Sequence, residues 1–198
     1  MTNVRATAPF APDNSSRVYG FWLFMMSDGL VFALLFAVYA TLLHATDGSP
    51  GGKEVLELKS ALIETLVLLV SSFTVGMAVL NLQFRPERRL YLVSWLSLTL
   101  VLGLTFLTLE ISDFVGMVHQ GATAQRSAYL SAFYALVATH GLHVAAGCLW
   151  LTVMLLQIKR FGLDETVRFR LGVLALFWHF LDVIWVAIYA VVYLQAAV

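Results

Sequence analysis

Five long apolar segments dominate the sequence, and their length limits what the chain can fold into. They cover residues 19–43, 60–82, 90–112, 128–158 and 171–197. Each is long enough to cross a hydrocarbon core of ~30 Å as a helix, which needs about 20 apolar residues. Only helices and closed barrels satisfy their backbone hydrogen bonds in lipid, and barrel strands are shorter and alternate in polarity. The segments therefore predict an all-α, polytopic membrane protein built as a bundle of five transmembrane helices.

The composition agrees with a membrane protein and excludes several other classes. Hydrophobic residues make up 60% of the chain and charged residues 12%, with a mean hydropathy of +0.84. A soluble domain is about half apolar and about a quarter charged. Twelve basic residues balance twelve acidic ones, so no nucleic-acid partner is expected. The single cysteine, Cys148, cannot form an internal disulfide or supply the thiolates of an iron-sulfur cluster.

The chain divides into an exposed N-terminal tail, residues 1–18, and a five-helix transmembrane domain, residues 19–198. The tail is polar and contains Pro9 and Pro12, so no cleaved signal peptide is expected. Basic residues are unequally divided between the two sides of the membrane, and the positive-inside rule then predicts a cytoplasmic N-terminus and a periplasmic C-terminus. The cytoplasmic set is Arg5, Arg17, Arg85, Arg88, Arg89, Lys159, Arg160, Arg168 and Arg170, against Lys53, Lys59 and Arg126 on the other side.

Ionisable residues within the apolar segments are the main candidates for function. A charge at the bilayer centre costs at least about 2.5 kcal/mol on insertion scales, so such groups are expected to face other helices, to pair or to bind something polar. The alternatives are a proton relay, a metal or haem site, a lipid-headgroup site, or hydrogen bonds that only fix helix packing. The predicted intramembrane polar network consists of Asp28, Glu64, Glu110, His140, His143, His179 and Asp182.

Spacing and depth arrange these residues further. His140 and His143 are three residues apart, as are His179 and Asp182, so each pair is expected on one side of a helix. A zinc site needs a third ligand and a second shell, so the two histidines alone assign no metal site, and no catalytic or cofactor-binding residue is predicted. We expect His179 and Asp182 to find partners on neighbouring helices, with Asp28 among the candidates. Glu64, Glu110 and Asp113 are expected toward the outer side of the membrane.

Tryptophans and small residues have plainer interpretations. Four tryptophans could line a lipid-filled cleft or simply pack between helices: Trp22, Trp150, Trp178 and Trp185. Small residues at helical spacing allow close approach of helix backbones and mark helix contacts. They are Ser71, Ser72, Gly76, Gly141, Ala145 and Cys148.

Three strings within these segments resemble a known family. They are Gly20-Phe-Trp-Leu-Phe-Met-Met-Ser-Asp28, His140-Gly-Leu-His143-Val and Trp178-His-Phe-Leu-Asp182-Val-Ile-Trp185. They occur in the same order in subunit III of haem-copper respiratory oxidases, and the resemblance runs from about Tyr19 to the C-terminus. Mitochondrial-type members have seven helices, whereas this five-helix chain is similar to the subunit III of cytochrome bo-type ubiquinol oxidases.

The resemblance implies a non-catalytic subunit in the aerobic respiratory chain, in the inner membrane of a bacterium. It would pack beside a catalytic subunit I that carries the haem and copper, reduces oxygen to water and pumps protons, together with subunits II and IV. Its own contribution would be assembly, phospholipid binding and support of proton uptake. The family's catalytic subunit binds its metals through six histidines, whereas this chain has five. Asp28 aligns with an intramembrane carboxylate that is a glutamate in mitochondrial-type members.

Other interpretations of the sequence stay open at this point. Some five-helix subunits belong to cytochrome c oxidases, so the electron donor is not fixed. A free-standing proton or ion transporter could use the same carboxylates and histidines, although all four prolines lie outside the segments and broken helices are not indicated. A dihaem-type membrane cytochrome would need axial histidines that face each other across helices, and a haem spectrum of the isolated chain tests that idea.

Overall fold

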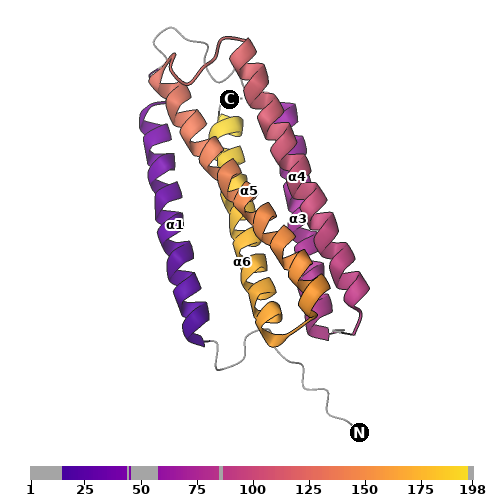
Figure 1. Ribbon diagram of the computed structural model, residues 1–198. Helices are drawn as coiled ribbons and strands as arrows, with labels where there is room; N and C mark the ends of the chain where they lie inside the picture. Colours follow the sequence, from indigo (N-terminus) through magenta and orange to yellow (C-terminus); the bar gives the residue numbers. More distant parts are fainter. Residues whose placement is uncertain (1–14, 44, 46–57, 85–86, 196–198) are drawn as a thin grey trace.

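The computed structural model describes residues 15–43, 45, 58–84 and 87–195, and within these ranges the chain is a bundle of long helices without strands (Figure 1). This confirms the predicted all-α architecture, since five of the helices are long and apolar enough to cross a membrane. The helices are α1 (Ser15–Thr41), α3 (Leu58–Phe84), α4 (Arg89–His119), α5 (Ala128–Phe161) and α6 (Glu165–Ile188), and η2 (Tyr189–Leu194) continues α6 as a π-helix.

Several helices extend beyond the apolar segments of the sequence, whereas α1 ends at Thr41, just before the end of its segment. α1 begins at Ser15, inside the stretch assigned to the tail, whose residues 1–14 lie outside the described ranges. α4 continues to His119, and α6 begins at Glu165, so most of the charged stretch from Lys159 to Arg170 is helical. Backbone hydrogen bonding does not stop where apolar residues stop, so polar flanks lengthen these helices toward the membrane surface.

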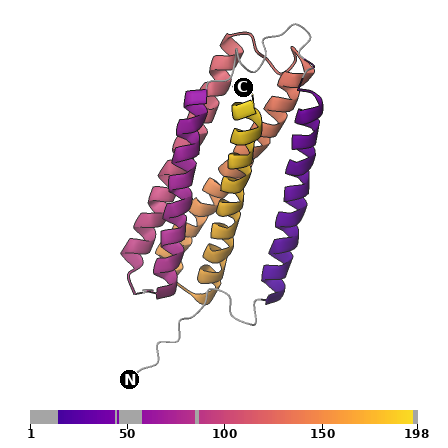
Figure 2. The ribbon, with the colours of Figure 1, turned by 180° about the vertical axis from the view of Figure 1, so that it is seen from behind.

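α6 is the central helix of the bundle. In Figure 1, α5 crosses diagonally in front of it, with α1 on one side and α3 and α4 on the other. Seen from behind in Figure 2, α6 lies between α3 and α1. In its apolar stretch 61% of the residues are buried, whereas the corresponding fraction for α1 is 11%. α1 contacts α5 and α6 and leaves most of its surface open to lipid or to a partner chain.

Hydrogen bonds from tryptophans of α6 to hydroxyl groups of α3 join these two helices. The indole Nε1 of Trp178 donates to Ser71 Oγ at 3.0 Å, and that of Trp185 donates to Thr65 Oγ1 at 3.0 Å. All four residues are buried. Between helices in a membrane, where the hydrophobic effect adds little, such bonds and close packing supply the attraction.

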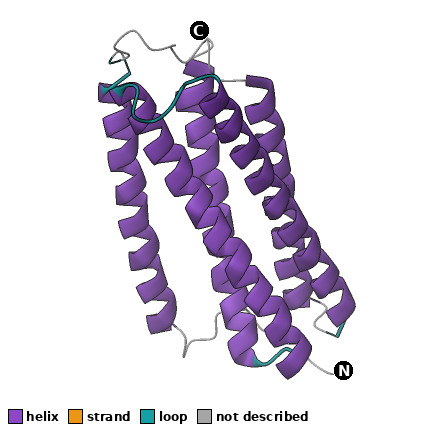
Figure 3. Ribbon diagram, turned by 45° about the horizontal axis from the view of Figure 1, so that its top comes forward, coloured by secondary structure: helices purple, strands orange, loops and turns teal. Residues whose placement is uncertain are grey.

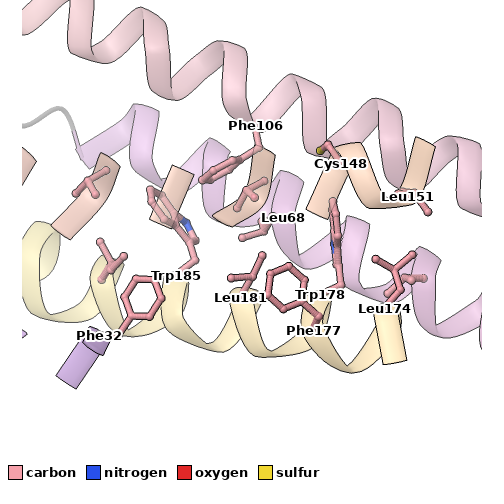
Figure 4. Packing of buried hydrophobic residues seen from close by; sticks show 14 of the residues in the cluster. Phe32, Leu68, Phe106, Cys148, Leu151, Leu174, Phe177, Trp178, Leu181 and Trp185 are labelled. Carbon is pink, nitrogen blue, oxygen red and sulfur yellow. The ribbon is translucent and has the colours of Figure 1, made fainter. Parts of the chain in front are cut away.

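Small residues make room for these tryptophans in the core. A β-carbon at Gly103 of α4 would lie 2.8 Å from the Trp178 ring, and one at Gly147 of α5 would lie 3.1 Å from it. Figure 4 shows Trp178 beside Cys148, and Trp185 beside Phe106. The rings of Phe106 and Trp185 meet edge to face, with centroids 4.7 Å apart and an interplanar angle of 88°. Glycine at these positions therefore lets α4 and α5 approach α6 closely.

The connection between α4 and α5 covers the end of the bundle where the C-terminus lies (Figure 3). Gly121 takes a positive φ of 76° in the turn, a conformation that favours glycine. Ser127 caps α5 by accepting a hydrogen bond from the Leu130 amide at 3.2 Å. The chain therefore reverses within a few residues.

Candidate functional site

Asp28 of α1 pairs with His143 of α5. The distance between His143 Nε2 and Asp28 Oδ1 is 3.1 Å, and the other ring nitrogen, Nδ1, lies 2.7 Å from the carbonyl oxygen of Thr139. Both side chains are largely buried, with 23% of the histidine and 11% of the aspartate side chain exposed. The pair connects the outlying helix α1 to the rest of the bundle.

The hydrogen bonds of His143 determine where the pair of Asp28 and His143 can hold a proton. A carbonyl oxygen only accepts, so Nδ1 must donate its proton to Thr139. Nε2 then donates to Asp28 only when the ring is protonated, and otherwise the Asp28 carboxyl must be the donor. In either arrangement a single proton bridges Nε2 of His143 and the Asp28 carboxyl group.

A second polar group lies between α3 and α6. His179 Nδ1 is 2.7 Å from Ser72 Oγ, and the Asp182 carboxyl is also within hydrogen-bonding reach of Ser72. His179 is exposed on the surface of the chain, whereas Asp182 and Ser72 are buried. Asp28, which was expected among the partners of His179 and Asp182, instead contacts His143, because α1 packs mainly on α5.

His140 is separated from its helical neighbour His143. Its side chain is fully buried, and neither ring nitrogen has a hydrogen-bond partner among the described residues. The ring lies among aromatic side chains, with centroid distances of 5.2 Å to Trp185, 5.8 Å to Phe106 and 6.3 Å to Phe32. The two histidines therefore do not converge on one ligand.

The two glutamates of the predicted network, Glu64 and Glu110, lie near the C-terminal end of α4. Together with Asp113 they line a small cavity there. Glu64 and Glu110 are almost completely buried. In the parts of the chain that the structure describes, no group of three or more histidine, cysteine, aspartate or glutamate side chains is placed to hold a metal ion.

The four tryptophans of the predicted lipid cleft have different surroundings. Trp178 and Trp185 are enclosed by the bundle, with 1% and 0% of their surface exposed. Trp22 is 48% exposed on α1, and Trp150 is partly buried and packs against Phe177 with centroids 6.0 Å apart. Only Trp22 and Trp150 are therefore placed where they could touch a lipid.

The role of the α3 hydroxyl groups is not evident from the sequence. The spacing of Ser71 and Ser72 indicates only small residues at a helix contact, and Thr65 and Thr74 are not among the predicted site residues. Ser71 and Thr65 accept from the two indoles, Ser72 binds His179, and Thr74 bonds Thr99 of α4 at 2.8 Å. Their common position on the buried face of one helix was the signal that could have identified them.

These groups can hold helices together and can hold protons, and comparisons with known proteins show the family to which the chain belongs. A family model described as cytochrome c oxidase subunit III matches residues 13–197. The cytochrome bo(3) ubiquinol oxidase subunit 3 of Pseudomonas aeruginosa is 45% identical over 182 residues, which cover 92% of this chain and 86% of the relative. The names of two further relatives indicate different electron donors.

The quinol oxidase subunit 3 of Bacillus subtilis is 40% identical, over 90% of this chain and 87% of the relative. The cytochrome c oxidase subunit 3 of Bacillus sp. strain PS3 is 38% identical, over 97% of this chain and 95% of the relative. All three likenesses run through nearly the whole chain. The chain belongs to the cytochrome c oxidase subunit III family.

Proposed function

We propose that the chain acts as subunit III of a bo(3)-type ubiquinol oxidase in a bacterial inner membrane. The observation that carries this proposal is the 45% identity to the Pseudomonas relative of that name over 92% of the chain. The partners are the haem- and copper-bearing subunit I and subunits II and IV. Affinity purification through a tag on this chain, followed by an optical spectrum and oxygen-uptake assays, tests the assignment. Haem that co-purifies with oxygen uptake driven by quinol, and not by reduced cytochrome c, is the expected result.

The role of the chain in that complex is non-catalytic. Two of its histidines are bonded between helices: His143 binds Asp28, and His179 binds Ser72. His140 is enclosed by aromatic rings and faces away from the other histidines. We therefore assign oxygen reduction to the partner subunit, and this chain supports the assembly of the complex. A haem-free chain that purifies alone and moves protons in liposomes would contradict this role and favour a transporter.

Phospholipid binding is the second part of the proposal, and the groove between α3 and α6 is its site. This groove has a volume of about 560 Å³ and is lined mainly by apolar side chains, including Leu69, Phe73, Leu80 and Leu176, with His179 at its polar edge. An acyl chain fits such a surface because it has no polar group that would be left unpaired against apolar side chains.

Native mass spectrometry of the purified complex tests the lipid site. Ala175→Trp places a large ring in the groove, since Ala175 lines it, and is expected to reduce the number of phospholipids retained. Leu149→Trp, at an exposed position on α5, is the matched control. Equal lipid retention in the two variants would remove this part of the proposal.

Support of proton uptake is the third part, and the Asp28 and His143 pair is its proposed carrier. Asp28→Asn keeps a hydrogen-bonding group beside His143 but removes the carboxyl that exchanges a proton. We expect the variant to assemble normally and to lose activity faster than the unaltered oxidase during sustained turnover. Glu87→Gln, in the exposed turn before α4, is the control. Unchanged sustained turnover in Asp28→Asn would contradict the assignment.

A further inference from the structure

A polar cavity lies inside the bundle near the end that carries the C-terminus. Its volume is about 100 Å³, and side chains from α3, α4, α5 and η2 line it. Three of the lining residues are acidic, and none is basic. We call this cavity, defined by Glu64, Glu110, Asp113 and Tyr193, the carboxyl pocket.

Two of the acids are buried with oxygens that lack a protein partner. Glu64 is 1% exposed and Glu110 is 4% exposed, and Oε1 of each has no hydrogen-bond partner in the described part of the chain. Both line the cavity, and Glu64 lies within electrostatic range of Glu110 and Asp113. Buried polar atoms are normally bonded, so these two oxygens indicate something that the protein itself does not supply.

The Glu110 carboxyl group lies against the backbone of α5. A β-carbon at Gly141 of α5 would stand 2.5 Å from both of its oxygens. Tyr193 reaches the pocket from the π-helical segment η2, a type of helix that is often found at functional sites. Its side chain is 6% exposed, and it lies within electrostatic range of all three acids.

A ligand of the carboxyl pocket has to be small and positively charged. Two buried carboxylates, Glu64 and Glu110, within a membrane-spanning bundle are strongly unfavourable unless a positive charge accompanies them. The described side chains do not converge as a metal site would require. A proton needs no such convergence, because carboxyl groups and water molecules share it through hydrogen bonds. The cavity has room for a few waters, and Ser112 and Gln120, both exposed, connect its lining to the surface.

We propose that the carboxyl pocket binds an exchangeable proton shared by Glu64, Glu110 and water molecules, and that this proton exchanges with the aqueous phase at the C-terminal end of the bundle. The titratable groups that face the pocket are Glu64 from α3, Glu110 and Asp113 from α4, and Tyr193 from η2, while α5 contributes Phe133. Tyr39 of α1 lies within electrostatic range of Tyr193. The site is separate from the Asp28 and His143 pair and does not depend on the electron donor.

Infrared spectroscopy of the complex purified through this chain tests the proposal. A protonated carboxyl has a C=O stretching band that carboxylates lack, and the band shifts in D2O when the proton exchanges. We expect the unaltered protein to show such a band, and Glu64→Gln and Glu110→Gln each to lose part of it. Glu87→Gln, at an exposed turn, is the control and is expected to leave the band unchanged.

Other results would overturn the proposal. The proposal would be wrong if neither glutamine variant changed the band, or if the band did not shift in D2O. If the band emerges only after sodium and potassium are replaced by a bulky organic cation, the pocket holds an alkali cation and not a proton. Should the glutamine variants fail to assemble, Tyr193→Phe removes only one hydroxyl from the lining. It is expected to shift the frequency of the band, and an unshifted band would contradict the proposed site.

Discussion

The Glu110 carboxyl group lies directly over the backbone of Gly141, so close that a β-carbon on Gly141 would stand 2.5 Å from each carboxyl oxygen. The two residues come from α4 and α5, and both are buried. A β-carbon essentially never approaches another heavy atom that closely. The absence of a side chain on Gly141 is therefore what allows a carboxyl group to lie between these helices.

Gly141→Ala is expected to destabilise the bundle. The new methyl group would have to displace the Glu110 carboxyl or separate α4 from α5, and overpacking of this kind costs about 1–3 kcal/mol. The measurement is the free energy of unfolding of the chain in mixed detergent micelles. Gly20→Ala is the control, because nothing lies within 4 Å of a β-carbon there. Equal stability of the two variants would mean that the carboxyl group moves aside without cost.

A double-mutant cycle on Trp178 and Ser71 measures the link between α6 and α3. Trp178→Phe removes the indole donor that bonds Ser71 Oγ at 3.0 Å, and Ser71→Ala removes the acceptor. Hydrogen bonds between membrane helices contribute about 0.6 kcal/mol on average and up to about 1.7 kcal/mol. We expect a coupling energy in this range. A coupling energy of zero would show that the bond does not stabilise the bundle.

The five helices could be predicted from the sequence because the length of an apolar segment is a local property. The ends of the helices could not, since α4 continues through polar residues to His119. Partners of individual side chains were harder still. His140 and His143 share one side of α5 by spacing, yet one faces the aromatic core and the other faces α1. Which neighbour each meets depends on the diagonal path of α5 across the bundle (Figure 1).

Asp28 illustrates the same limit at the candidate site. Its depth in the membrane suggested a partner on α6, but several helices cross the membrane at that depth. The packing of α1 on α5 selects His143, and a single sequence contains no direct record of that packing. The hydroxyl acceptors on α3 were missed for a related reason, because a serine that bonds a distant indole looks like any small residue at a helix contact.

Asp28→Leu is expected to weaken the attachment of α1, whereas Asp28→Asn is expected to preserve it. Leucine leaves Nε2 of His143 without its partner at 3.1 Å, and a buried group left unsatisfied costs about 1–3 kcal/mol. The asparagine amide still offers both a donor and an acceptor. Limited proteolysis of the connection after α1 in detergent measures the difference. Identical cleavage rates for the two variants would contradict a structural role for the pair.

Asp182→Leu is expected to reduce the retention of this subunit in the oxidase more than Asp113→Leu does. Asp182 is buried between α6 and α3 within reach of Ser72, and leucine there leaves the Ser72 and His179 pair without its carboxyl neighbour. Asp113 is only partly buried and lies beside two other acids, so its removal lowers the local negative charge. The measurement is the amount of this subunit that co-purifies with haem after solubilisation in detergent. Equal retention of the two variants would mean that the contacts of Ser72 with His179 and Asp182 do not help to hold the subunit in the complex.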